Sequence, residues 1–169
     1  MTNDIALRTA DANDVSLMKA FIFEHGVNQW NFLPEAEVSS HLAAIARGRT
    51  HAVIAEVDGR LAGFATYMVS KDLARYQSPA HAGTHGYICE AVVARQYTGK
   101  GIGARMLHEA IARLAGMGCR EIYIERHEEN RASAGMMRKA GFVEVDTFDD
   151  PERRANGSRR TTVCRVVID

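Results

Sequence analysis

The amino-acid sequence predicts a mixed α/β fold, with a largely antiparallel central sheet of about seven strands flanked by about four helices. Strand and helix patterns alternate in the order β-α-α-β-β-β-α-β-α-β-β, and an Asp-Gly turn joins two apolar runs in the first half. The second half contains a β-α-β unit, whose helix must lie on the sheet. Because the 169 residues include no Pro- or Ser-rich linker, we expect residues 1–169 to form a single domain.

The first elements follow from apolar spacing and capping residues. Residues 5–7 alternate between apolar and polar, as in a short strand. Asp11 and Asp14 stand where helix caps belong, ahead of apolar residues at helical spacing in 15–22. A second helix is expected to open at Pro34, because proline is favoured in a first helical turn.

The middle of the chain reads as a hairpin followed by a loop. His51–Val57 and Leu61–Val69 are apolar runs separated by Asp58-Gly59, a pair that favours a tight turn with positive φ angles. The polar stretch Ser70–Gly86 is expected to be a long loop.

The second half alternates between strands and helices, bounded by glycines that stop helices and by one asparagine that caps one. The expected elements are a strand over Tyr87–Ala94, a helix over 102–114 that stops at Gly116-Met117-Gly118, a strand over Glu121–Arg126, a helix from Asn130 to Ala140, and strands over Phe142–Phe148 and Arg160–Ile168.

Composition narrows the class of protein. Twenty-one basic residues balance twenty-one acidic ones, which argues against a general nucleic-acid or polybasic membrane binder. The three cysteines form no CxxC pair or disulfide framework. Residues 1–8 lack the basic start and apolar stretch of a signal peptide, and no apolar run is long enough to cross a bilayer. We therefore expect a cytoplasmic protein.

The most informative segment is a glycine turn at the start of a predicted helix. Gly99, Gly101 and Gly103 alternate there, and Lys100 adds a positive charge at the rim. Glycines let the backbone approach a ligand closely, while the first helical N–H groups and the positive helix end favour an anion. The segment therefore predicts a phosphate or pyrophosphate site, although glycines can also serve only a tight turn and close packing.

Two other phosphate-binding motifs compete with this interpretation of the segment. Residues 99–104 satisfy the dinucleotide pattern G-x-G-x-x-G/A, but residues 95–98 separate them from the preceding strand, and that strand does not begin the sheet. The nucleoside-triphosphate loop G-x-x-x-x-G-K-[ST] is absent because Gly101 follows Lys100. The context disfavours both.

Two motifs resemble the GNAT superfamily of acyl-CoA-dependent N-acetyltransferases. The family's phosphate motif, Q/R-x-x-G-x-G/A, is similar to the segment from Thr98 to Gly103. Its asparagine-led helix, which ends in Gly-Phe, is similar to Asn130–Phe142. With the order of elements, the resemblance covers essentially the whole chain. It implies the GNAT (acyl-CoA N-acyltransferase) fold and acetyl-CoA as the co-substrate.

The resemblance also implies a site for acetyl-CoA at the end of one strand, the glycine turn and the later helix cap. Backbone N–H groups around Val92 and Val93 are expected to polarise the thioester carbonyl. Two positions depart from the family: Thr98 replaces a long Arg or Gln, and Met137 stands where many members carry a tyrosine acid. The expected cofactor-binding residues are Ala91, Val92, Val93, Thr98, Gly99, Lys100, Gly101, Ile102, Gly103, Ala104 and Asn130.

Glu90 is the candidate catalytic base, because it is the one acid in an otherwise apolar strand. An acceptor ammonium with a pKa of about 10.4 must lose a proton before it can attack the thioester. Partial burial would raise the pKa of Glu90 and make it a better base. The alternatives are a buried partner for an arginine and a carboxylate that only orients the substrate.

Other reactive side chains give weaker evidence of a chemical role than Glu90 does. Cys89 in an apolar strand is more typical of a small buried hydrophobe than of a nucleophile. His81 and His85 are four residues apart but have no third ligand in sight, so no metal site is expected. The missing tyrosine acid could be replaced by Tyr97, Tyr123 or His127, although packing or surface exposure explains each of them as easily.

The sequence says least about which residues form the acceptor pocket. Trp30 and Phe32 are candidate substrate-binding residues, although they could equally cap the core. The loop over 71–86 is a second candidate region. In the terminal loop 149–160, arginines would suit a carboxylate or phosphonate on the acceptor if they line the site, although most such charge runs are solvated.

The sequence thus predicts an N-acetyltransferase that moves acetyl from acetyl-CoA to a primary amine by direct attack on the thioester. A small molecule such as an amino acid, polyamine or antibiotic is the favoured acceptor. The alternatives are a protein N-terminal or lysine acetyltransferase and a non-catalytic acyl-CoA sensor, with a dinucleotide-binding protein as a distant third. A homodimer is plausible, since sheet edges in such folds can pair.

Overall fold

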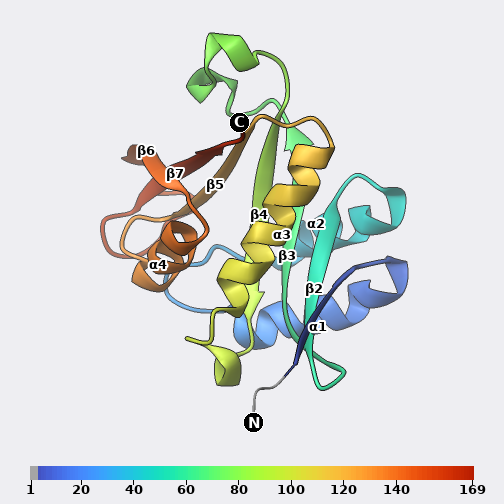
Figure 1. The fold of residues 1–169 in the computed structure, drawn as a ribbon. Coiled ribbons are helices and arrows are strands. Elements are labelled where there is room, and N and C mark those ends of the chain that lie inside the picture. Colours follow the sequence, from blue (N-terminus) through green and yellow to red (C-terminus); the bar gives the residue numbers. More distant parts are fainter. Residues whose placement is uncertain (1–3) are drawn as a thin grey trace.

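One seven-stranded sheet runs through the protein in the order β1-β2-β3-β4-β5-β7-β6, in a computed structural model that describes residues 4–169 (Figure 1). All neighbouring strands are antiparallel except β4 and β5, which are parallel. This confirms the predicted fold class. The first residues of the segment inspected for a signal peptide lie outside the described residues. The strands are β1 (Ile5–Thr9), β2 (His51–Val57), β3 (Arg60–Ser70), β4 (His85–Val93), β5 (Glu121–His127), β6 (Val143–Asp149) and β7 (Arg160–Val167).

Four α-helices cover the two faces of the sheet (Figure 1). They are α1 (Val15–His25), α2 (Glu35–Ala43), α3 (Ile102–Gly116) and α4 (Arg131–Lys139). Helices α1 and α2 bury Met18 and Leu42 against Phe64 on one face. On the other face α3 buries Met106 and Leu114, which are both fully inaccessible to solvent. Apolar burial on both faces therefore holds the strands as the central layer.

The hairpin between β2 and β3 forms where the sequence predicts it. Asp58 and Gly59 have φ angles of 52° and 75°, the positive values that match the twist of a two-residue hairpin turn.

The sheet opens between β4 and β5. The two strands pair only from Gly86–Ile88 to Ile122–Ile124. Beyond Ile88, β4 continues to Val93 paired with β3 alone, and β5 continues to His127 paired with β7 alone. The carboxyl halves of these two central strands therefore lose their shared hydrogen bonds, and a gap opens in the middle of the sheet.

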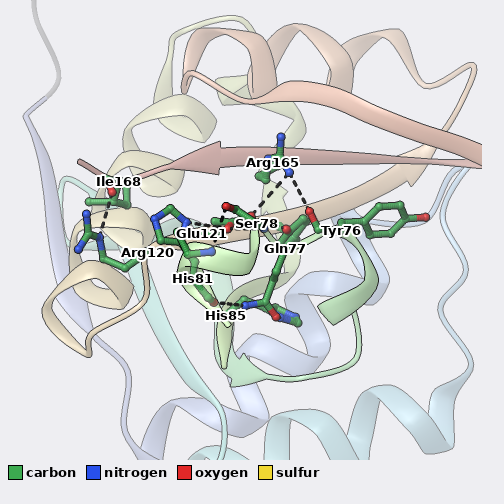
Figure 2. A network of polar contacts seen from close by, with 11 residues as sticks. Tyr76, Gln77, Ser78, His81, His85, Arg120, Glu121, Arg165 and Ile168 are labelled. Carbon is green, nitrogen blue, oxygen red and sulfur yellow. Dashed lines mark hydrogen bonds and ion pairs between the residues drawn. The ribbon is translucent and has the colours of Figure 1, made fainter. Parts of the chain in front are cut away.

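The segment between β3 and β4, expected to be a long loop, contains two 3-10 turns, Ala74–Tyr76 and Pro79–His81. Figure 2 shows how buried Glu121 holds it. One Glu121 oxygen accepts a hydrogen bond of 3.0 Å from the Ser78 amide and lies 2.7 Å from His81 Nδ1. The other oxygen accepts from the Tyr123 hydroxyl at 2.8 Å.

A second set of contacts fixes the same segment. His85 Nδ1 lies 2.9 Å from Gln77 Oε1, and Arg165 donates to the Tyr76 carbonyl at 2.9 Å (Figure 2). The segment is thus held where β4 begins, whereas the glycine turn follows the end of β4. Residues 71–86 therefore lie at the start of β4, at the opposite end of that strand from the site described below, and none of them lines either of its cavities.

Candidate functional site

The glycine turn connects β4 to α3 through a short 3-10 turn, Arg95–Tyr97. Gly99 and Gly101 have φ angles of 81° and 80°, and Gly101 caps α3 without a side-chain hydrogen bond. A Cβ atom at either glycine would meet nothing within 4 Å. The glycines are therefore required by backbone conformation, and the space in front of them is open. The first N–H groups of a 15-residue helix face that space without a side-chain cap.

A cavity of about 410 Å³ runs along the turn and across to α4. Thr98 lines it, whereas the Lys100 ammonium lies 5.7 Å from the centre of the Tyr97 ring. A Cβ on Gly103 would come within 2.4 Å of Met136 Sδ, so this third glycine also permits the close contact of α3 with α4. Of the expected cofactor-binding residues, those that line this cavity are Ala91, Val92, Val93, Thr98, Gly99, Gly101, Ile102, Gly103, Ala104 and Asn130.

A β-bulge interrupts β4 beside this cavity. Glu90 pairs with Thr66 and Ile88 pairs with Tyr67, so Cys89 has no partner on β3. Bulges redirect side chains and are frequent next to active sites. Here the bulge leaves Cys89, Glu90 and Ala91, three consecutive residues, on the wall of a second cavity.

The second cavity has a volume of about 270 Å³ and lies at the gap between β4 and β5. It adjoins the first cavity, since five residues line both. These shared residues are Asn31, Ala91, Asn130, Ser133 and Met136. A path therefore leads from the glycine turn through the open sheet to Glu90.

The environment of the second cavity changes the pKa of Glu90 in a way that suits a proton acceptor. Burial raises its pKa to about 7, although Arg154 acts in the opposite sense. Burial also raises the pKa of the Cys89 thiol, so Cys89 is a neutral thiol at physiological pH. At neutral pH, therefore, a substantial fraction of Glu90 is a carboxylate that can accept a proton.

His41, on α2, lines neither cavity but contacts the backbone of Glu90 through Thr66, a link that was not found from the sequence. Its Nε2 lies 2.9 Å from the hydroxyl of Thr66, which also accepts a hydrogen bond of 3.1 Å from the Glu90 amide. Burial lowers the pKa of His41, so it is neutral at pH 7. No pattern on α2 distinguishes His41 from a surface residue, because its partner is 25 residues away in sequence.

The two aromatic candidates of the acceptor pocket separate in the structure. Phe32 lines the second cavity and is 42% exposed. Trp30 is not among the lining residues; its ring packs against His127 with 4.5 Å between ring centres. Trp30 contributes its carbonyl instead, which accepts a hydrogen bond from Arg154.

The terminal loop between β6 and β7 supplies two arginines to the second cavity, Arg153 and Arg154. Arg153 forms ion pairs with Glu125 at 3.0 Å and Asp150 at 2.7 Å. Glu125 also accepts a hydrogen bond of 2.7 Å from Tyr87. This loop thus contributes to the wall of the cavity, whereas residues 71–86 do not.

Most of the candidate proton donors either lack a proton or contact other groups of the protein. Met137, at the family's tyrosine position, is 4% exposed and has no proton to give. Tyr123 donates to Glu121, and His127 Nε2 lies 2.7 Å from the Asn156 carbonyl. Tyr97 alone of the three alternatives lines the first cavity.

Within residues 4–169 no group of three or more His, Cys, Asp or Glu side chains is placed to hold a metal ion. His81 and His85 are engaged by Glu121 and Gln77. None of the helices in the same range has the length and apolar character needed to cross a membrane.

Comparison with known proteins agrees with this geometry. The model of the acetyltransferase (GNAT) family matches residues 16–142, and the chain therefore belongs to the GNAT family. Curated protein sequences gave no match.

Solved structures share the fold at low sequence identity. NAA60 of Arabidopsis thaliana, in complex with acetyl-CoA, is 19% identical with a TM-score of 0.77, over 98% of this chain and 99% of that one. A mosquito arylalkylamine N-acetyltransferase like 5b is 12% identical with a TM-score of 0.78, over 98% and 100%. A GNAT acetyltransferase of Streptococcus pneumoniae is 18% identical with a TM-score of 0.73, over 98% and 100%.

Proposed function

We propose that this protein transfers an acetyl group from acetyl-CoA to a primary amine of a small molecule. The observation that carries the proposal is the junction of the two cavities: one lies along the glycine turn, the other contains Glu90, and they meet at the gap in the sheet. The GNAT family match supports it, as does the acetyl-CoA bound in the similar Arabidopsis structure.

The first cavity fits the pyrophosphate of acetyl-CoA. The uncapped start of α3 offers N–H donors and the positive end of the helix dipole, in the open space that Gly99 and Gly101 leave. Because these donors belong to the backbone, they remain even though Thr98 replaces the longer Arg or Gln of the family. The thioester would lie at the end of β4, and its carbonyl oxygen would face the backbone N–H groups around Val92 and Val93.

Glu90 acts as the general base in this proposal. The acceptor ammonium has a pKa of about 10.4, so one proton must move to a base before or during attack. The carbon–nitrogen bond then forms while the carbon–sulfur bond breaks, and the thiolate leaves with the electron pair. The second proton that the nitrogen loses as the amide forms goes to the thiolate or to solvent. A thiolate is a good leaving group, since thiols have a pKa of about 8.5, so the reaction can proceed with Met137 at the position of the tyrosine acid.

A small acceptor suits the second cavity. Its volume of about 270 Å³ lies behind the terminal loop that carries Arg153 and Arg154. The structural relatives include an arylalkylamine N-acetyltransferase-like protein and an agmatine N-acetyltransferase. The alternative is a peptide acceptor, which has a counterpart in Arabidopsis Naa50 in complex with a bisubstrate analogue, CoA-Ac-MVNAL.

The proposal is tested by thermal shift with acetyl-CoA, free CoA and NAD, followed by thiol release with a panel of amines and short peptides. A ligand at 100 times its Kd stabilises the native state by about 2.7 kcal/mol, which such a measurement detects. We expect stabilisation by both CoA species and thiol release with small amines. Stabilisation without turnover would indicate an acyl-CoA sensor, turnover with peptides alone a protein acetyltransferase, and stabilisation by NAD alone a dinucleotide-binding protein.

A further inference from the structure

The second cavity is lined by six acidic or basic side chains, and most of them are paired or exposed. Arg153 is paired with Glu125 and Asp150. Arg126 is paired with Glu144 on β6 through Nη2, although its buried Nε and Nη1 have no hydrogen-bond partner in the described part of the chain. Glu37 is exposed at the rim. The six are Glu37, Glu90, Glu125, Arg126, Arg153 and Arg154.

Two buried charged groups of this set, one of each sign, have no ion pair among the described residues. Within residues 4–169 neither Glu90 nor Arg154 takes part in an ion pair. The two are not in direct contact, yet each belongs to the cavity wall, and the charge of Arg154 lowers the pKa of Glu90. The cavity thus holds a separated carboxylate and guanidinium.

Arg154 is buried with only neutral partners. It is 8% exposed, its Nε donates to the Thr161 hydroxyl at 2.8 Å, and its Nη1 donates to the Trp30 carbonyl at 3.3 Å. Two acids lie near Arg154, Glu125 and Asp150, but both are paired with Arg153, and Asp150 also accepts a hydrogen bond from Thr161. A buried guanidinium without a carboxylate is costly, and arginine does not lose its proton in proteins.

One guanidinium nitrogen of Arg154 is free to bind a ligand. No hydrogen bond from its Nη2 to another group occurs in the described part of the chain, although the residue lines the cavity. Guanidinium groups bind carboxylates with short, charge-assisted hydrogen bonds. An anionic group entering the cavity would therefore supply the partner that the protein itself does not.

We infer that the acceptor is an amine that also carries a carboxylate, namely a free amino acid, with its carboxylate on Arg154 and its amine at Glu90. This inference rests on the proposed function and narrows its substrate class. The zwitterion pairs both remaining charges of the cavity. A polyamine, an arylalkylamine or a lysine side chain would pair Glu90 but leave Arg154 without an anion.

The first test uses the wild-type protein and matched acceptors, with thiol release from acetyl-CoA as the readout. The pairs are leucine with isopentylamine, arginine with agmatine and phenylalanine with phenethylamine, and each amino-acid amide serves as a neutral control of the same shape. We expect kcat/KM to be about 10- to 100-fold higher for the amino acid than for its amine or amide in at least one pair, the value of one charged hydrogen bond. Equal or higher kcat/KM for every amine overturns the inference and leaves the acetyltransferase function standing.

The second test assigns the preference to Arg154. Arg154→Gln should raise KM for the amino acid more than it lowers kcat, so that the amino-acid-to-amine ratio of kcat/KM falls toward one. Arg154→Lys, which keeps the charge, should restore part of that ratio. Arg159→Gln is the matched control, since Arg159 lies in the same loop but is exposed, and it should leave the ratio unchanged.

Binding separates failure of this inference from failure of the function. Amino acids should raise the Tm of the CoA-saturated wild-type protein, and the matched amines should do so less. An unchanged ratio in Arg154→Gln, in protein that still binds CoA, would contradict the role of Arg154. If no amine were acetylated and no amino acid raised the Tm, both the inference and the catalytic function would be overturned.

Discussion

At the scale of single residues, the site depends on one buried carboxylate. Glu90 lies on the bulged part of β4, where its amide is bonded to Thr66 and its side chain faces a cavity. Burial raises its pKa to about 7. A general base is most effective when its pKa lies near the pH at which the reaction runs, so this value suits a reaction at neutral pH. The same burial leads us to expect effects of Glu90 on both turnover and stability.

Replacing Glu90 tests its role in turnover. Glu90→Gln should lower kcat by about 10²–10⁴, the usual contribution of a general base, while the Kd for acetyl-CoA changes little. In the wild-type protein, kcat should rise as the pH increases through about 7, because only the deprotonated carboxylate accepts a proton. Steady-state kinetics and CoA titration measure both effects. A variant with wild-type kcat and the same pH profile would exclude Glu90 as the base.

Glu90 also makes a prediction about stability against pH. Its pKa is raised from 4.5 in the unfolded chain to about 7 in the fold, so the native state holds the extra proton between these values. Stability from this residue is complete below pH 4.5 and is lost as the pH rises through 7. Glu90→Gln should therefore be more stable than wild type by about 3 kcal/mol at pH 8 and equal to it near pH 4.5. Urea unfolding at both pH values measures this, and a difference independent of pH would contradict it.

At the scale of elements, the start of α3 combines a structural requirement with a binding surface. Gly101 is the left-handed cap of the helix, and the space in front of it is open. A side chain there would strain the backbone and enter the space proposed for the pyrophosphate. Gly116, at the other end of α3, has ordinary φ and open surroundings, so it provides a comparison within one helix.

The pair Gly101→Ala and Gly116→Ala separates these effects. Gly101→Ala should lower the free energy of unfolding by about 1–2 kcal/mol through left-handed strain and raise the Kd for acetyl-CoA about tenfold. Gly116→Ala should raise stability by about 0.5 kcal/mol through helix propensity and leave the Kd unchanged. Denaturation and CoA titration measure both quantities. If both variants bound acetyl-CoA like the wild type, the glycine turn would not be its site.

At the scale of the whole molecule, the two ends of the central strands have different roles. At one end the carboxyl halves of β4 and β5 separate, and both cavities form there. At the other end the segment before β4 is fastened to buried Glu121 (Figure 2). The fold thus separates a structural network from the proposed site by the length of β4.

This separation predicts that the network can be weakened without a change in substrate binding. His81→Ala removes the 2.7 Å contact with Glu121 and should lower the free energy of unfolding by about 1–2 kcal/mol. The KM values for acetyl-CoA and for the amine should remain unchanged. His108→Ala, at an exposed position on α3, is the control and should change stability by less than about 0.5 kcal/mol. A raised KM for the amine in His81→Ala would show that the segment contributes to acceptor binding.

The order of elements and the glycine turn could be predicted because both are local properties of the sequence. Apolar spacing, caps and the Asp58-Gly59 turn act within a few residues, and the structure has the same order of strands and helices. Gly99 and Gly101 needed only the backbone conformation that glycine allows. The sequence by itself therefore determined the fold class and the backbone conformation of the glycine turn.

The tertiary structure alone decided what surrounds Glu90. The bulge at Cys89, the contact of His41 with Thr66 and the approach of Arg154 all join residues that are far apart in the chain. Whether an arginine is solvated or buried opposite a carboxylate depends on how a loop packs, because the cost of burying charge is set by three-dimensional neighbours and not by local pattern. For the same reason the loop before β4, polar and long, could not be placed at the far end of the sheet until its partners on β5 and β7 were known.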